Sequence, residues 1–166
     1  MLNKKIEEIL NLQIEKEAYS SHLYLAMASW SENQGYEGTS LWLYHHVEEE
    51  RNHMLKFVKY INERGGCSII PALNEPPRKF GNISDMFKEI LEHEEFITNS
   101  INEIVAICLD EKDFTTHNWI QWFVTEQIEE ESLVKGILDK LNLLDGKNLY
   151  LFDKDIKASI PTAASL

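Results

Sequence analysis

Four long stretches of this sequence each carry an acidic residue where the surrounding pattern of apolar residues predicts a buried side chain. They are Glu17, Glu50, Glu94 and Glu130, the last preceded by Gln127. An ionised carboxylate is strongly disfavoured in an apolar interior unless another group compensates its charge. Several of them meeting in one core predict a metal site, and the set is typical of a di-iron carboxylate centre inside a four-helix bundle.

His53 adds a nitrogen ligand to this set. It follows Glu50 by three residues, which places both side chains on one face of a helix. This Glu-x-x-His pair is the inward-pointing ligand motif of di-iron bundles, and carboxylate with imidazole suits iron. The motif alone is weak, because a Glu-rich helix contains it by chance. The competing interpretation is an internal network of ion pairs or hydrogen bonds, but no Lys or Arg lies among the residues that interrupt the apolar pattern to neutralise the carboxylates.

Further polar residues lie beside these candidates. Glu49, Glu126 and Glu129 flank the acids of the apolar seam, so they are either a solvated helix face or ligands of an additional cation. Tyr24 follows Glu17 by seven residues and shares its face, either as a core tyrosine or as a hydrogen-bonding, redox-active neighbour of the metals. Spacing alone leaves both questions open.

Other side chains near these positions are expected to be structural. We expect Trp122 to pack in the core, and Cys108 to be a small core residue on an apolar helix face. The remaining histidines have no second ligand at a suitable spacing on the seam, so we expect them at the surface or its boundary. They are His22, His45, His46, His93 and His117.

Apolar residues recur at spacings of three and four, the pattern of helices that pack along a bundle seam. The pattern predicts an all-α protein. The expected helices are 4–33, 40–64, 83–111, 114–143 and a short fifth helix over 148–159. Thr39 is expected to cap the second helix.

The lengths of the connections predict how these helices are ordered in space. Short turns join the first two and the last two long helices as antiparallel pairs. The connection over 66–82 can extend to roughly 56 Å at about 3.3 Å per residue, whereas a helix of about 26 residues is only roughly 39 Å long. It can therefore run the full length of the bundle and make the second and third helices parallel, with one long crossover.

Length and charge fit one such domain over residues 1–166. The chain has 166 residues, 43% of them apolar, enough for a sizeable core. Its net charge of −12 argues against binding nucleic acid, where phosphate neutralisation dominates. No apolar run reaches the roughly 20 residues that span a bilayer, and the N-terminus turns acidic before a signal-peptide core can form. We expect a cytoplasmic protein with no membrane partner.

With these motifs in place, the chain closely resembles the prokaryotic non-haem ferritins over essentially its whole length. The resemblance rests on Glu17 in Gln-Ile-Glu-Lys-Glu-Ala-Tyr, on Glu-Glu-Arg-Asn-His ending at His53, and on Glu94 in Glu-His-Glu-Glu-Phe. Tyr24 and the run Trp122-Phe-Val-Thr-Glu-Gln-Ile-Glu-Glu also match. The resemblance implies a 24-subunit hollow cage that oxidises Fe(II) with dioxygen or hydrogen peroxide and stores ferric mineral inside.

The resemblance also implies a role for each candidate residue. Glu17, Glu50 and His53 would form the first iron site, and Glu50 would bridge to a second site completed by Glu94 and Glu130. Three further acids, with Glu130 shared, match the family's third iron site. They are Glu49, Glu126 and Glu129.

Three smaller features complete the match. Gln127 would form hydrogen bonds at the edge of the centre, and Tyr24 matches the tyrosine that the family places near it. The segment 148–159 matches the fifth helix, which meets its symmetry mates at the fourfold axes of the cage.

The sequence differs from three families related to the ferritins at the positions that define their metal and haem sites. Bacterioferritins carry a second Glu-x-x-His on the fourth helix, where this chain has Gln127 and Glu130. Their haem-binding Met lies two residues after the bridging Glu, where this chain has Asn52, so no haem is expected. DNA-protecting mini-ferritins place their site between subunits, and rubrerythrins need a CxxC-bearing module that this sequence lacks.

Two other functions remain open at this stage. A di-iron oxidase or peroxidase of the same superfamily would turn over an organic substrate or peroxide, store nothing and need no cage. A plain helical interaction module would have its internal acids paired and would bind no metal.

Overall fold

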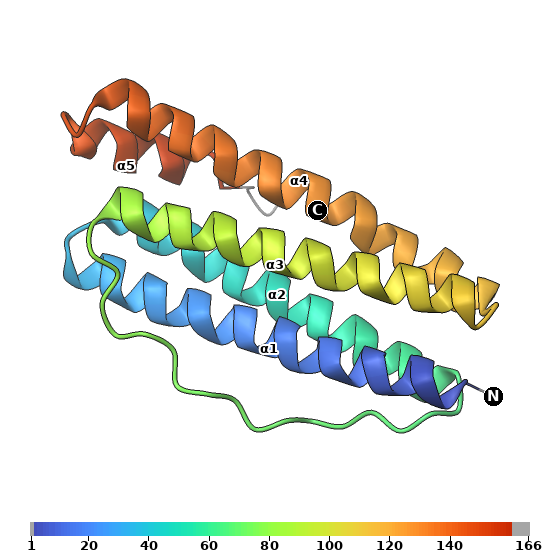
Figure 1. Ribbon diagram of the computed structural model, residues 1–166. Coiled ribbons are helices and arrows are strands. Elements are labelled where there is room, and N and C mark those ends of the chain that lie inside the picture. The colour runs from blue at the N-terminus through green and yellow to red at the C-terminus, as the bar shows by residue number, and fades with distance from the viewer. Residues whose placement is uncertain (1, 161–166) are drawn as a thin grey trace.

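The computed structural model describes residues 2–160, and every regular element in that range is an α-helix. The helices are α1 Lys4–Asn33, α2 Glu37–Glu63, α3 Ile83–Asp110, α4 Phe114–Leu144 and α5 Leu149–Ala158. α1 packs along α2 and α3, α3 packs along α4, and α5 packs against α2 and α4 (Figure 1). Within residues 2–160, no helix combines the length and the apolar content that crossing a membrane requires.

The connection between α2 and α3 runs along the outside of the bundle from one end to the other (Figure 1). α2 and α3 therefore point in the same direction, while α1 with α2 and α3 with α4 form antiparallel pairs. The predicted fold class, a four-helix bundle with one long crossover and a short fifth helix, is confirmed.

Helix starts show where local sequence signals suffice and where they do not. Asn82 and Asp113 cap α3 and α4, because their side chains accept hydrogen bonds from backbone N–H groups in the first turn. The expectation that Thr39 caps α2 is wrong, since α2 begins at Glu37. The backbone N–H groups of Gly38 and Thr39 instead donate to the Asp153 carboxylate of α5, each at 2.8 Å.

Gly38 allows α5 to approach α2 this closely. A Cβ atom on Gly38 would lie 1.9 Å from the backbone carbonyl oxygen of Asp153, so any larger residue would push the two helices apart. The approach brings Phe152 and Ile156 into the core, where they are 2% and 3% exposed. α5 is thus packed across the start of α2.

The core consists of two apolar clusters, one toward each end of the bundle. One contains the second half of α1, the start of α2 and α3, the end of α4, and α5. The other contains the first half of α1, the end of α2 and α3, and the start of α4. On every long helix, the residues between the two clusters include buried polar side chains, which together form a polar layer across the middle of the bundle. They are Glu17, Ser20, Glu50, His53, Glu94, Gln127 and Glu130.

The predicted seam accounts for this layer well. All predicted seam positions of α3 and α4 are buried, Glu94, Gln127 and Glu130 among them. On α1 and α2, the seam positions spaced by three and four residues around Glu17 and Glu50 are also buried, except for Ser21 and Met54, which are partly buried. The acids therefore face the core because they lie on the same helix face as the buried apolar residues.

Candidate metal centre

Ligand atoms converge at two places in or beside the polar layer. The first group, hereafter the buried cluster, is Glu17, Glu50 and His53, with one ligand atom of each lying within 4.8 Å of the others. His53 Nδ1 lies 3.6 Å from Glu50 Oε2 and 3.9 Å from Glu17 Oε2. The second group, hereafter the open cluster, is His46, Glu49 and Glu130.

The buried cluster fits a metal ion because one of its atoms lacks a partner. Among the described residues, Glu17 Oε2 is the one buried side-chain polar atom without a hydrogen bond. Glu17 is only 1% exposed, and buried polar groups in native proteins are otherwise nearly always paired. A carboxylate oxygen left free beside a second carboxylate and an imidazole has the position and chemistry of a metal ligand.

Burial and mutual repulsion raise the pKa of three carboxyl groups in the layer. Burial raises the pKa of Glu17 well above its usual value, and the nearby Glu50 adds to the effect. Burial also raises the pKa of Glu50, with Glu94 and Glu130 contributing. Burial and the charge of Glu94 raise the pKa of Glu130 to about 8. Each raised pKa favours the protonated form of its carboxyl group when no metal is bound, and a dication would displace such a proton on binding.

The pairing of these acids argues against a purely structural role. Within residues 2–160, the ion pairs of Glu17 and Glu50 are with His53, and that of Glu130 is with His46. No Lys or Arg of the described chain forms an ion pair with any of the three. Within this part of the chain, the alternative of an internal network therefore loses its Lys and Arg ion pairs, whereas hydrogen bonds do reach Glu17 and Glu94.

Glu94 is held differently from Glu17. The Tyr24 hydroxyl donates a hydrogen bond to Glu94 Oε1, and Gln127 Nε2 donates one to Glu94 Oε2 at 3.0 Å. Both carboxylate oxygens therefore have donors, and Glu94 belongs to neither converging group. The structure places it in the layer beside the buried cluster, and ligating a metal would require it to exchange or share these hydrogen bonds.

Tyr24 is thus both a core residue and a direct neighbour of the acidic layer. It is 2% exposed, and burial together with the charge of Glu94 raises the pKa of its hydroxyl well above the usual value. It therefore remains a proton donor to Glu94 at neutral pH.

The open cluster lies beside the layer and faces a hollow. His46 Nδ1 lies 2.9 Å from Glu49 Oε2 and 3.9 Å from Glu130 Oε2. A surface hollow of about 490 Å³ is lined by these three residues together with Glu126 and Glu129. The structure therefore gathers the three acids predicted to flank the seam around one opening.

One contact links the buried cluster to the acidic lining of the hollow. Glu126 Oε1 lies 3.7 Å from Nε2 of His53, whose Nδ1 faces the buried cluster. His53 therefore separates the buried carboxylates from the acids of the hollow.

Two expectations for aromatic side chains prove wrong. His46 is not at the surface or its boundary: it is 5% exposed and packs on Trp42 with ring centroids 3.9 Å apart. Its position four residues before Glu50, on the same helix face, is the signal that indicates an inward side chain. Trp122 is not a core residue, since it is 41% exposed, with Lys56 over its ring and its edge toward His53.

The other expectations of this kind agree with the structure. Cys108 is fully buried in the apolar core, and burial raises its thiol pKa to about 11. The remaining histidines are exposed or partly exposed; they are His22, His45, His93 and His117.

Two buried residues that sequence reasoning missed contact this layer. Gln13 Nε2 donates a hydrogen bond to Glu17 Oε1 at 2.7 Å, and Ser100 Oγ donates one to Gln13 Oε1 at 2.5 Å. Gln13 lies four residues before Glu17, a spacing that indicates a contact on one helix face. Ser100 is on α3, and no local pattern connects it to α1.

Comparison with known proteins extends these observations. The ferritin-like domain family matches residues 7–144, a range that includes every residue of the polar layer. The chain is 44% identical to a probable bacterial non-heme ferritin-like protein of Haemophilus influenzae, covering 94% of this chain and 96% of that protein. It is 42% identical to the bacterial non-heme ferritin of Campylobacter jejuni, over 95% of each. An open pore ferritin from the archaeon Archaeoglobus fulgidus superimposes with a TM-score of 0.92 at 38% identity, covering 94% of this chain and 96% of that one.

Proposed function

Because the chain belongs to the ferritin family, we propose that it is an iron-storage subunit with ferroxidase activity. It oxidises Fe(II) to Fe(III) within its own helical bundle and passes the ferric product to a stored mineral. The observation that supports this most directly is the free Glu17 Oε2 facing Glu50 and His53 in the buried cluster.

The ligand geometry suggests how Fe(II) binds as substrate. The first ion takes Glu17 Oε2, Glu50 and His53 Nδ1, which already converge. The second shares Glu50 and adds Glu130, and Glu94 joins when its hydrogen bonds from Tyr24 and Gln127 rearrange. A carboxylate between two ions holds them within reach of one oxidant molecule, so positioning contributes much of the rate.

The residues also account for the electrons and protons. Each Fe(II) gives up one electron, so a bound pair supplies the two electrons that reduce dioxygen to hydrogen peroxide, or hydrogen peroxide to water. Fe(II) binding displaces the protons that burial keeps on Glu17, Glu50 and Glu130. The released protons are available close to the oxidant, and the reduction of either dioxygen or hydrogen peroxide takes up protons.

The open cluster is proposed as a third site, through which iron enters or leaves the pair. All three of its members line the hollow, Glu49 is partly exposed, and the buried His46 supplies an imidazole beside Glu49 and Glu130. Glu126 and Glu129 complete the acidic lining. An ion held here would exchange with solvent more readily than one in the buried cluster.

Storage requires a cavity, and we propose a 24-subunit cage that supplies it. The solved relative is described as an open pore ferritin, a term that implies an enclosing wall. Leu143 and Tyr150, at the junction of α4 and α5, are 86% and 82% exposed and offer apolar surface to other subunits. A mass of 24 chains by light scattering supports the cage, whereas a monomer or dimer would favour the non-storage di-iron oxidase.

The experiment that tests the oxidation step is rapid mixing of Fe(II)-loaded protein with oxygenated buffer. The protein should show a fast phase that saturates near two irons per chain, and Glu50→Ala should abolish it while the variant stays folded. Glu48→Ala is the matched control, because Glu48 is an exposed acid on the same helix. A fast phase retained in Glu50→Ala would contradict the proposal.

A further inference from the structure

A chain of hydrogen bonds leads from the protein surface to Glu17. Lys16 Nζ donates to Ser100 Oγ at 2.5 Å, and Ser100 Oγ donates to Gln13 Oε1 at 2.5 Å. Gln13 Nε2 then donates to Glu17 Oε1 at 2.7 Å. Gln13 and Ser100 are 0% and 4% exposed, so these bonds form in the interior, whereas Lys16 is partly exposed. We call Lys16, Ser100 and Gln13 the Gln13 relay.

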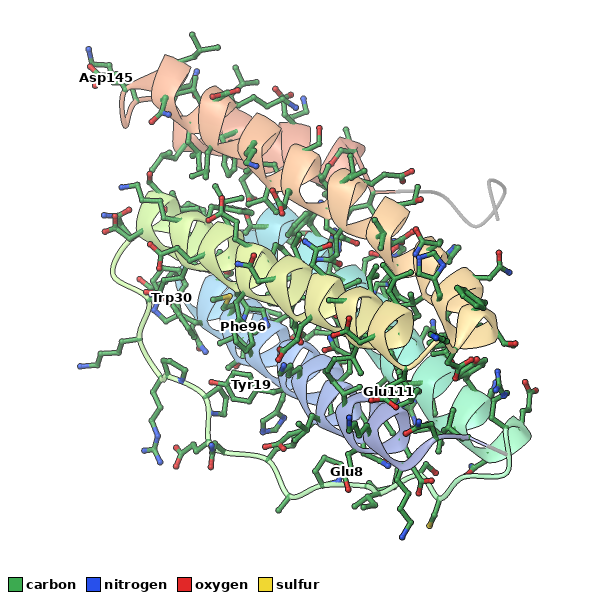
Figure 2. All side chains as sticks on the ribbon, turned by 45° about the vertical axis from the view of Figure 1, so that its right-hand side comes forward. Glu8, Tyr19, Trp30, Phe96, Glu111 and Asp145 are labelled. Atoms are coloured by element: carbon green, nitrogen blue, oxygen red, sulfur yellow. The ribbon has the colours of Figure 1, made fainter. Side chains whose placement is uncertain are left out.

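The outer end of the relay lies where α1 and α3 meet. The Lys16 ammonium lies 5.4 Å from the centre of the Phe96 ring, and both residues line a surface hollow together with Tyr19. Figure 2 shows Tyr19 and Phe96 together on the side of the bundle where α1 and α3 lie next to each other. The relay therefore runs between two helices and depends on their packing.

The two ends of the relay set the direction of its hydrogen bonds, because Lys16 donates at the outer end and the Glu17 carboxylate accepts at the inner end. A Lys ammonium only donates, so Ser100 Oγ must accept from Lys16. The single hydroxyl hydrogen of Ser100 is then available for the Gln13 carbonyl oxygen. This leaves the Gln13 amide with its NH₂ toward Glu17. With the amide turned over, the Gln13 carbonyl oxygen would face the Glu17 carboxylate, so two acceptor oxygens would meet at that contact.

The relay makes the two oxygens of Glu17 unequal. Oε1 accepts from Gln13, whereas Oε2 has no hydrogen-bond partner and faces His53 and Glu50. Glu94 offers the contrast, because both of its oxygens accept hydrogen bonds. Of these two acids, only Glu17 is already oriented with one oxygen bound to protein and the other available.

We infer that Gln13, oriented by Ser100 and Lys16, is a positioning residue that presents Glu17 Oε2 to the first iron ion and sets the affinity of that site. The inference rests on the proposed function, since it requires Glu17 to be a ligand. Partners that orient a metal ligand typically change metal affinity by about 10–100-fold when removed. The relay acts on binding, so its loss should raise the Fe(II) concentration needed for half-maximal rate and leave the maximal rate nearly unchanged.

The test combines anaerobic Fe(II) titration with initial oxidation rates measured against Fe(II) concentration. Three variants interrupt the relay at different points: Gln13→Leu, Ser100→Ala and Lys16→Met. We expect half-saturating Fe(II) to rise by about 10-fold or more in Gln13→Leu and Ser100→Ala, and by a few-fold in Lys16→Met, with maximal rates within about twofold of the unaltered protein. Lys16→Arg keeps a donor and should restore the lower value.

Ser20→Ala provides the matched control. Ser20 is fully buried on α1, and its hydroxyl bonds to the Lys16 backbone carbonyl and to His93 but not to Glu17. Its replacement removes a comparable buried hydroxyl and leaves the side-chain hydrogen bonds of the relay in place. If Gln13→Leu fails to fold, Lys16→Met still tests the inference, because Lys16 is partly exposed.

The outcomes separate this inference from the proposed function. Unchanged half-saturating Fe(II) in Ser100→Ala and Lys16→Met overturns the inference alone, as does an equal shift in Ser20→Ala. A parallel fall in maximal rate and melting temperature, with affinity unchanged, would assign the relay a purely structural role. Absence of saturable Fe(II) binding in the unaltered protein overturns the proposed function and this inference with it.

Discussion

The buried cluster and the open cluster use the same ligand types in different surroundings. Glu17 and Glu50 are 1% and 3% exposed, whereas the Glu49 side chain is 38% exposed and faces the hollow. Burial strengthens the attraction between a carboxylate and a dication, but it also slows exchange with solvent. The buried cluster is therefore suited to holding ions for oxidation, and the open cluster to passing them on.

The pKa values of the carboxyl groups also differ between the buried residues and the partly exposed Glu49. Burial raises the pKa of Glu17 and Glu50, each near another acid. Burial also acts to raise the pKa of Glu49, but the hydrogen bond and charge of His46, with the charge of His45, hold it below the usual value. Within the open cluster, Glu49 is thus ionised at neutral pH, whereas burial raises the pKa of Glu130 in the same direction as those of Glu17 and Glu50.

Replacing Glu17 tests the buried half of this comparison and should have the largest effect. Glu17→Gln keeps the shape but exchanges an anionic ligand oxygen for an amide, so we expect the fast oxidation phase to slow by about 100-fold or more. Glu15→Gln, an exposed acid on the same helix, should leave the rate unchanged. Rapid-mixing absorbance measures both. If the Glu17→Gln variant oxidised Fe(II) at a rate within a few-fold of the unaltered protein, the buried cluster would not be the site that holds iron for oxidation.

The second prediction concerns the stability of the metal-free protein between pH 5 and pH 8. The folded-state pKa of Glu130 is raised from 4.5 to about 8, so the folded chain keeps a proton that the unfolded chain loses above about pH 4.5. This contribution to stability is present at low pH and is lost as pH rises toward 8. Glu17 and Glu50 act in the same direction.

We therefore expect the melting temperature to fall by at least about 3 °C across this range, since ~1 kcal/mol corresponds to about 2–4 °C in a chain of this size. Calorimetry of the metal-free protein measures the change. Glu130→Gln should flatten the dependence, and bound metal should reduce it. A melting temperature that rises steadily from pH 5 to pH 8 would mean that the buried acids are already ionised.

Replacing His46 tests the open half and should have the smallest effect. His46→Gln removes one imidazole from the open cluster and leaves the buried cluster intact, so the first oxidation phase should change by less than about twofold. Later rounds, which need iron to clear the centre, should slow by about 3- to 10-fold. Successive Fe(II) additions in an oxygen electrode separate these phases. His22→Gln, at an exposed site on α1, serves as control. If only the first phase slowed, the open cluster would act in oxidation and not in the transfer of iron away from the centre, which would contradict the account.

The sequence predicts the parts of the fold that depend on periodic burial and chain length. Glu94 and Gln127 are buried as the apolar period predicts, because the long helices must bury one face. The crossover follows equally directly, since the connection before α3 is long enough to run the length of the bundle.

What the sequence does not predict depends on contacts between distant segments. The cap of α2 comes from Asp153 on α5, so no local motif reveals it. Ser100 reaches Gln13 from another helix. His46 and Trp122 flank the seam, where burial depends on how a neighbouring helix covers each position, and both expectations fail there.

The central claim is that Glu17, Glu50 and His53 hold iron, and the most direct test locates the ions. A crystal soaked anaerobically with Fe(II) and measured at the iron absorption edge gives their positions by anomalous scattering. We predict one ion bound by Glu17 Oε2, Glu50 and His53 Nδ1, with a second on the other side of Glu50. Iron confined to the surface acids, with Glu17 Oε2 uncoordinated at saturating Fe(II), would contradict the account.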